Sequence, residues 1–173
     1  MISCTYENGH KTSLRHVVVD AIVMPAGRHD INKNKILLIR RAAHLTNGGK
    51  WAIPGGFLDR DETCKQAVSR ELKEETGLNG KNVKLFKITD DPNRKNEDRQ
   101  NIAFIYTMEA EGEINFDPEE VSEAKWFDIK NLPPEKDFAF DHFGIIQEYL
   151  NNSPVILSAA KNLDPESLRQ NSG

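Results

Sequence analysis

Apolar residues fall in short runs along the chain, and the spacing within each run predicts a type of secondary structure. Residues 16–24 (HVVVDAIVM) and 35–41 (KILLIRR) are apolar, rich in β-branched side chains and bounded by turn-forming residues, which is typical of buried strands. Residues 82–88, 101–109 and 125–128 also favour strands, although they are shorter or more polar. We therefore expect five main strands.

A helix is predicted over residues 64–76, where apolar positions follow the helical period. Thr63 fits the N-cap, and Gln66 completes a capping box with it. Gly77 occupies the position where a left-handed residue commonly ends a helix.

A second amphipathic helix is expected from His142 to about Leu150, with Asp141 as its N-cap. Strands interleaved with two helices imply a layered α/β domain. We divide the chain into an N-terminal extension (1–14), one domain (15–151) and a flexible tail (152–173).

Composition restricts the classes of function. The sequence has no apolar run of about 18 residues, which argues against a membrane span, and its first residues lack the apolar stretch of a signal peptide. Cys4 and Cys64 are too few for a disulfide framework, so a reducing cytoplasm is expected. A formal net charge of −4 argues against a nucleic-acid polymer as the partner.

Three carboxylates interrupt the inward face of the first predicted helix. Glu71, Glu74 and Glu75 stand at i, i+3 and i+4, so they are neighbours on one helical face, which apolar residues share. Like charges at this spacing cost roughly 0.2–0.5 kcal/mol per pair, and burial adds to the cost. A hard cation such as Mg²⁺ would offset both penalties. The pattern therefore predicts a metal site, although glutamate pairs are also common on solvated helices.

The residues around this cluster are more specific. The chain meets every defined position of the pattern G-x5-E-x7-R-E-U-x-E-E-x-G-U, where U is aliphatic, and thereby resembles the Nudix hydrolases over residues 15–150. The matching positions are Gly56, Glu62, Arg70, Glu71, Leu72, Glu74, Glu75, Gly77 and Leu78. This resemblance implies an α/β/α sandwich with a mixed, partly curled sheet between the helices.

The resemblance also implies a chemistry: hydrolysis of the pyrophosphate linkage between a nucleoside and another group, with Mg²⁺ as cofactor and Mn²⁺ as the alternative. The substrate would be a small-molecule nucleotide, and a homodimer would be in keeping with the family. Metal ligation would fall to Glu74, Glu75 and the Gly55 carbonyl, with Glu71 close by as a ligand or base.

Other candidate residues surround these ligands. Arg70 lies one turn before Glu74 and can hold its carboxylate, or it can contact phosphate. Glu62 would act through water or local structure. Many relatives use a further acidic residue on a loop before a later strand; Glu120 fits that place, in competition with its neighbours Glu119 and Glu123. The choice of Glu71 or a loop glutamate as general base stays open, because it depends on reach to the attacking water.

The segment FAFDH (138–142) resembles the ADP-ribose pyrophosphatase branch of the family. We therefore expect ADP-ribose as substrate and AMP and ribose phosphate as products, with three candidate phosphate contacts: Arg40, Arg94 and Arg99. The polar loop that follows residue 89 is longer than this branch suggests. Two alternatives remain: a nucleoside triphosphate pyrophosphohydrolase that clears unwanted nucleotides, and a non-catalytic nucleotide-binding module.

Overall fold

The computed structural model describes residues 2–27, 34–94 and 99–152, so the predicted tail lies outside it from residue 153 onward. Within these ranges the elements are β1 (Ile2–Thr5), β2 (Lys11–Leu14), β3 (Val17–Pro25), β4 (Lys35–Arg41), β5 (Trp51–Ala52), β6 (Gly55–Phe57), α1 (Cys64–Thr76), β7 (Asn79–Thr89), β8 (Ile102–Glu111), β9 (Val121–Asp128), the 3-10 turn η2 (Glu135–Asp137) and α2 (His142–Asn152). The five expected strands and both helices are present, and β7 and β9 begin earlier than predicted.

The strands of the domain form two adjoining sheets. One has the order β6-β3-β8-β7 and the other the order β5-β4-β9. β3 runs parallel to β8, from Val17 opposite Ile102 to Pro25 opposite Ala110, whereas every other pair of these strands is antiparallel. The sheet that contains β3 and β8 is therefore mixed, which agrees with the mixed sheet of the expected fold class. Neither sheet closes on itself.

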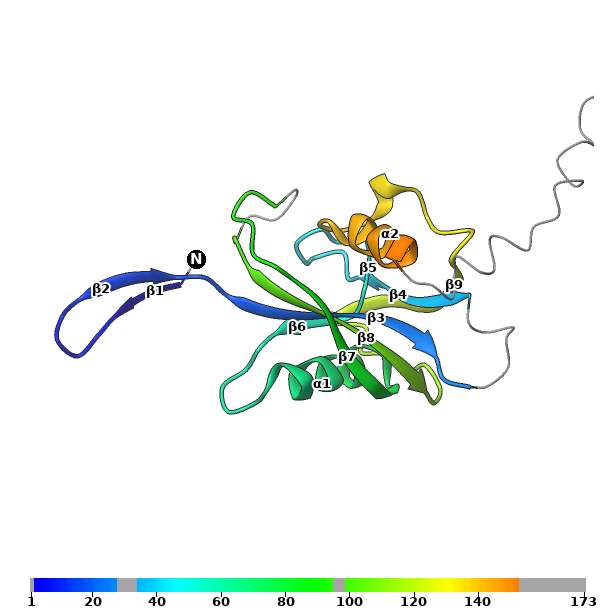
Figure 1. Cartoon of the computed structure of the whole chain (residues 1–173), viewed down its shortest axis with the longest axis horizontal. Coiled ribbons are helices and arrows are strands. Elements are labelled where there is room, and N and C mark those ends of the chain that lie inside the picture. The colour runs from blue at the N-terminus through cyan, green and yellow to red at the C-terminus, as the bar shows by residue number, and fades with distance from the viewer. Residues whose placement is uncertain (1, 28–33, 95–98, 153–173) are drawn as a thin grey trace, which may run out of the picture.

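A helix covers each face of the strands, which gives three layers (Figure 1). β3 serves both faces because its side chains alternate. Val19, Ala21 and Val23 pack in the cluster under α1, and Ile22 packs in the cluster under α2. Each helix contributes its own apolar stripe: Ala67, Val68 and Leu72 from α1, and Ile145 and Ile146 from α2.

Helix α1 has the predicted bounds, because local signals fix both of its ends. The Thr63 hydroxyl accepts a hydrogen bond from the Gln66 amide (3.3 Å), and the Gln66 side chain accepts one from the Thr63 amide (2.9 Å). Gly77 has a left-handed φ of 73°, and its amide donates to the carbonyl of Lys73. These caps set the rotation of the helix, and thereby place its glutamates.

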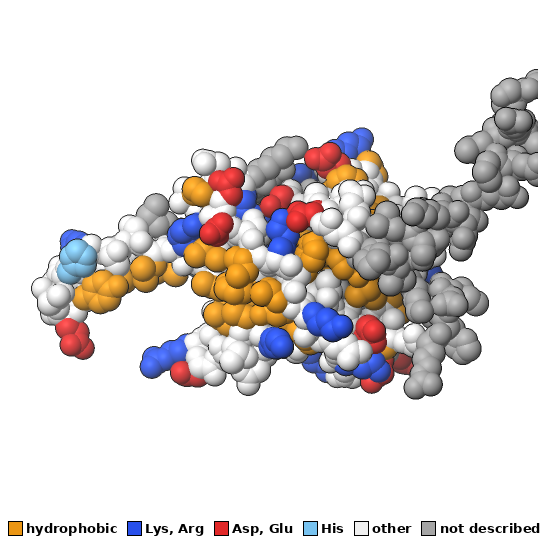
Figure 2. All heavy atoms as spheres, viewed as in Figure 1, with side chains coloured by type: hydrophobic (Ala, Val, Ile, Leu, Met, Phe, Trp, Pro, Cys, Tyr) orange, Lys and Arg blue, Asp and Glu red, His pale blue; other side chains and the backbone are white. Residues whose placement is uncertain are grey.

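Residues 2–14 of the N-terminal extension form a β-hairpin that projects from the domain (Figure 1). β1 and β2 pair only with each other, and Asn8-Gly9 lies in the connecting turn. Figure 2 shows apolar side chains along the hairpin and on the adjacent part of the domain. The exposed large apolar residues there and elsewhere are Ile2, Tyr6, Leu14, Phe57, Leu85 and Ile88. No helix in the described ranges is long and apolar enough to cross a membrane.

Candidate active site

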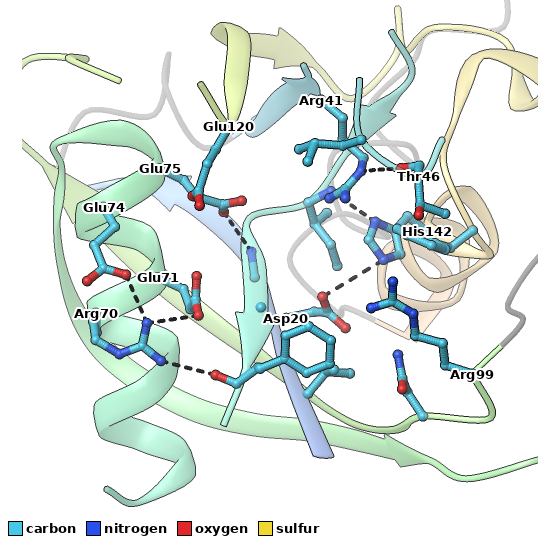
Figure 3. Close-up of a pocket in the computed structure, with 18 of the residues that line it drawn as sticks. Asp20, Arg41, Thr46, Arg70, Glu71, Glu74, Glu75, Arg99, Glu120 and His142 are labelled. Carbon is cyan, nitrogen blue, oxygen red and sulfur yellow. Dashed lines mark hydrogen bonds and ion pairs between the residues drawn. The ribbon is translucent and has the colours of Figure 1, made fainter. Parts of the chain in front are cut away.

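A cleft opens between α1, β6, the turn before β9 and the start of α2 (Figure 3). Its most informative property is its charge distribution, because opposite charges line opposite sides. The acidic wall consists of Glu71, Glu74, Glu75 and Glu120, and the arginine wall consists of Arg41, Arg94 and Arg99. Asp20 and His142 lie between the two walls. Such a cleft can hold cations on one side and an anion on the other.

The two adjacent glycines allow the acidic wall to approach the sheet. The Gly55 amide donates a 2.8 Å hydrogen bond to Oε2 of Glu75, which is only 5% exposed. A Cβ on Gly55 would lie 2.2 Å from the Val19 carbonyl oxygen, and one on Gly56 would lie 2.4 Å from Oε1 of Glu71. Only glycine therefore fits at either position without displacing a neighbour.

Arg70 joins the acidic wall to the loop that precedes α1. Its Nη1 donates to Glu71 (2.9 Å) and to Glu74 (2.8 Å), so the contact expected one turn along the helix is present. Its Nε and Nη2 donate to Glu62 at 3.2 and 2.8 Å, and Nη2 also donates to the Phe57 carbonyl. Glu62 accepts the Asp59 amide as well. Glu62 thus holds Arg70, and Arg70 holds two glutamates.

The two inner carboxyls of the acidic wall, Glu75 and Glu71, have raised pKa values. Burial raises the pKa of Glu75 well above the ordinary value, against the opposing effect of the Gly55 amide. Burial is also the main cause of the raised pKa of Glu71, and Arg70 opposes it. By contrast, the hydrogen bond from Arg70 lowers the pKa of the Glu62 carboxyl. The two inner carboxylates therefore lack sufficient positive charge from the protein alone.

The donor set of this wall suits a hard divalent cation, since it consists of carboxylate and carbonyl oxygens. Within the described ranges, however, no three acidic, His or Cys side chains converge as a ready ligand cage. Arg70 binds one oxygen of each of the two glutamates, Oε1 of Glu71 and Oε2 of Glu74. The other oxygen of each carboxylate takes no part in these bonds. The residue types fit a metal, provided that the side chains adjust around it.

Glu120 is the member of the acidic loop that lines the cleft. It precedes β9, and its backbone carbonyl accepts the Ala42 amide, which fixes the turn beside Glu75 (Figure 3). Glu123 instead pairs with Lys125 (2.7 Å) and Arg40 (3.7 Å) on the strand. Glu119 does not line the cleft either. Of the three competing glutamates, only Glu120 lines the cleft.

The structure separates Arg40 from the other candidate phosphate contacts. Its Nε donates to the Gly49 carbonyl (2.8 Å), and its guanidinium lies 5.7 Å from the ring of Trp51, outside the cleft lining. The next residue, Arg41, lines the cleft and was not among our candidates. Successive side chains of a strand point to opposite faces, so the side chains of Arg40 and Arg41 in β4 diverge. The pairing with β9 also shifts at this point.

The members of the arginine wall differ in what already holds them. Arg41 donates to the Thr46 carbonyl (2.8 Å) and lies 5.4 Å from the Phe140 ring. Arg94 makes a bidentate pair with Asp141 at 2.9 and 2.7 Å, and its side chain is only 5% exposed. Arg99 lies 5.8 Å from the ring of Phe57. The Asp141 carboxylate thus binds Arg94, in addition to preceding α2.

Asp20 of β3 and His142 of α2 are buried between the walls, and our sequence reasoning did not select either as a site residue. Nδ1 of His142 accepts the Ile53 amide (3.2 Å), and its Nε2 lies 3.9 Å from Oδ1 of Asp20. Burial raises the pKa of Asp20 to about 7, and burial lowers the pKa of His142 to about 4. His142 is therefore neutral near pH 7.

Known proteins share both the sequence pattern and the fold. A family model described as the NUDIX domain matches residues 14–149. An ADP-ribose pyrophosphatase of Methanocaldococcus jannaschii is 38% identical over 117 residues, which cover 68% of this chain and 66% of that protein. The NAD-capped RNA hydrolase NudC of Vibrio atlanticus is 37% identical over 109 residues, which cover 59% of this chain but only 36% of NudC.

Two crystal structures are similar as well. The NUDIX domain of Shewanella oneidensis NrtR, complexed with ADP ribose, aligns with a TM-score of 0.64 and 27% identity, covering 81% of this chain and 89% of that one. A bifunctional NMN adenylyltransferase/ADP ribose pyrophosphatase of Francisella tularensis, complexed with AMP and a Mn ion, aligns with a TM-score of 0.63 and 30% identity, covering 81% of this chain and 42% of that one.

Proposed function

The chain belongs to the NUDIX domain family, and from this premise we propose that it hydrolyses the pyrophosphate linkage of ADP-ribose, releasing AMP and ribose phosphate in a metal-dependent reaction. The observation that carries the proposal is the cleft with an acidic wall facing an arginine wall. An ADP-ribose pyrophosphatase among the relatives and two structural neighbours with ADP ribose or AMP bound support the choice of substrate. Two unbridged cysteines agree with a reducing compartment such as the cytoplasm.

We assign the metal to the acidic wall, with Glu74, Glu75 and the Gly55 carbonyl as ligands and Glu71 beside them. When bound, Mg²⁺ or Mn²⁺ would neutralise charge on the diphosphate and lower the pKa of water. The raised pKa values of Glu71 and Glu75 support this assignment, since buried carboxylates need a compensating charge. Arg70 and Glu62 keep the glutamate side chains in position through the hydrogen bonds described above.

We propose that one of two carboxylates accepts the proton of the attacking water. Glu71 lies against Gly56 on the sheet, and Glu120 approaches from the turn before β9. The base is the one whose replacement by Gln removes the acidic limb of the pH–rate profile. We propose that Arg41 and Arg99 hold the diphosphate. Arg94 lines the same wall, and its bidentate pair with Asp141 holds it there.

A substrate panel tests the proposal. ADP-ribose, dinucleotides and nucleoside triphosphates are each incubated with the protein and Mg²⁺, and AMP, phosphate and pyrophosphate are measured. Release of AMP and ribose phosphate from ADP-ribose, lost in EDTA and restored by Mg²⁺ or Mn²⁺, is the expected result. Release of pyrophosphate from triphosphates alone would make the protein a triphosphate pyrophosphohydrolase. Binding of a nucleotide without cleavage of any would make it a ligand-binding module.

A further inference from the structure

The floor of the cleft holds a donor and an acceptor that the proposed hydrolysis does not use. His142 is 5% exposed and Asp20 is 7% exposed, yet both line the cleft between its two walls (Figure 3). Asp20 belongs to β3, which precedes Gly55 in the chain, and His142 is the first residue of α2, which follows it. Burying a carboxylate and an imidazole costs free energy, so their presence in the floor requires an explanation.

The hydrogen bond from Ile53 determines which nitrogen of His142 carries the proton. An amide N–H can donate to Nδ1 only if that nitrogen has a free lone pair, so the proton of the neutral ring is on Nε2. Nε2 of His142 and Oδ1 of Asp20 face each other at a distance of 3.9 Å. That distance is too long for a direct hydrogen bond.

The same distance is short enough for one oxygen atom to bond to both groups. An oxygen about 2.8 Å from each would accept the proton of Nε2–H and could donate its own proton to Asp20. A hydroxyl group has this combination, because it carries one donor and two acceptor lone pairs. A phosphate oxygen has no proton to donate, so it could bond to both groups only where the Asp20 carboxyl is protonated.

The surrounding residues hold this pair in place. Phe140 has a φ of 52°, a left-handed conformation that costs a bulky residue roughly 1–3 kcal/mol. The Phe140 ring lies 5.2 Å from the His142 ring. The Arg41 guanidinium also lies against the Phe140 ring, 5.4 Å from its centre. The next residue, Asp141, is bound by Arg94 in a bidentate pair. Strain and a buried ion pair on the two residues before His142 indicate that the position of its ring matters.

We propose that Asp20 and His142 together recognise a sugar hydroxyl of the substrate, Nε2–H of His142 donating to the hydroxyl oxygen and Asp20 accepting its proton. This inference rests on the proposed function, because the substrate is taken to be a nucleoside diphosphate linked to ribose. The second oxygen of Asp20 is then available to the adjacent hydroxyl of the same ribose. The pair makes the cleft selective for ribosyl over deoxyribosyl groups, a property that neither wall provides.

The test pairs enzyme variants with substrates that lack one hydroxyl. Wild type, Asp20→Asn and the control Asp61→Asn are assayed on ADP-ribose and on analogues deoxygenated singly at each ribose hydroxyl. Asp61 is suited to the control because its side chain is 87% exposed. The Asp20→Asn substitution conserves side-chain volume, and thermal unfolding checks that the fold is retained.

A hydrogen bond to a charged group changes kcat/KM by about 10- to 150-fold. We expect Asp20→Asn to lose activity on ADP-ribose by that factor, mainly through KM, and Asp61→Asn to match wild type. For the analogues that lack a hydroxyl bound by Asp20 the loss should be clearly smaller, because part of the interaction is already missing and the two changes are not additive. Equal losses on ADP-ribose and on every analogue would overturn the proposal, since they would mean that the pair holds only water or the fold.

The two proposals fail separately in this design. If wild type does not cleave ADP-ribose in the presence of Mg²⁺, the proposed function is wrong. In that event the analogues are replaced by matched ribonucleotides and deoxyribonucleotides of whichever class the protein cleaves. If it cleaves none, calorimetry compares the binding of AMP with that of its deoxy form. If wild type cleaves ADP-ribose and no analogue reduces the Asp20→Asn effect, only the recognition of a hydroxyl is wrong.

Discussion

Replacing Asp20 by Asn should stabilise the folded protein in a strongly pH-dependent way. Asp20 is 7% exposed, and burial raises the pKa of its carboxyl from the ordinary value of 3.8 to about 7, despite the opposing effect of Arg94. Asn has nearly the same shape but no charge to bury. The variant therefore removes a cost that begins at the pH where Asp20 ionises in the unfolded chain and grows up to its pKa in the folded protein.

The sign and size follow from the two pKa values. Below pH 3.8 the carboxyl is protonated in both the folded and unfolded states, so it contributes no difference. Between pH 3.8 and about 7 the unfolded chain releases the proton while the folded protein keeps it, and the fold loses stability as pH rises. Above about 7 the loss is constant. About three pH units at roughly 1.36 kcal/mol each give a final difference of about 4 kcal/mol.

Urea unfolding of wild type and Asp20→Asn in EDTA, between pH 4 and pH 8.5, measures this difference directly. Titration of the other buried carboxyls is common to both proteins and largely cancels. We expect the variant to be more stable by little at pH 4 and by about 4 kcal/mol at pH 8, with Asp61→Asn as a flat control. A stability difference that is the same across this range would refute the burial argument for Asp20.

The acidic wall and helix α1 give three further predictions. Glu75→Gln should keep the fold but lose most turnover and the thermal stabilisation that Mg²⁺ confers, measured by activity and thermal shift; wild-type turnover at saturating Mg²⁺ would contradict its role as a ligand. Gly56→Ala should reduce activity with little loss of stability, because its Cβ meets only the movable end of the Glu71 side chain. Gly55→Ala should destabilise the fold, because its Cβ meets the Val19 backbone. Equal free energies of unfolding for the two variants in urea would contradict this reasoning. Thr63→Ala should cost about 1 kcal/mol in the same measurement through loss of the N-cap, and an unchanged unfolding midpoint would show that the capping box is dispensable.

The parts of the structure that depend on short stretches of sequence were predictable. Helix α1 has the expected bounds because its N-cap, capping box and C-terminal glycine are all local signals. The same is true of the contact between Arg70 and Glu74, which needs only helical spacing. The β1–β2 hairpin was also within reach, since Asn8-Gly9 is a strong hairpin turn signal, but its flanking residues are too polar to draw attention.

The parts that depend on tertiary geometry were not predictable. Arg40 and Arg41 are adjacent and lie on opposite faces of β4, and the packing of the whole domain decides which face borders the cleft. Asp20 lies in an apolar run and is read there as a strand residue. His142 fits an ordinary helix start, and it meets Asp20 only because β3 and α2 pack together in the folded domain. An isolated acid in a buried strand was the one available signal for a site residue.

The cleft concentrates groups that work against folding. Asp20 and Glu75 are almost fully buried carboxyls with raised pKa values, and Phe140 has a strained backbone beside them. A sequence selected only for stability would place apolar side chains and a glycine at these positions. The free-energy cost of burying each carboxyl decreases when a ligand supplies the missing partner, which is a cation for the acidic wall and a hydroxyl for Asp20. Binding and stability should therefore be coupled, so that Mg²⁺ and nucleotide together raise the unfolding temperature more in wild type than in Asp20→Asn.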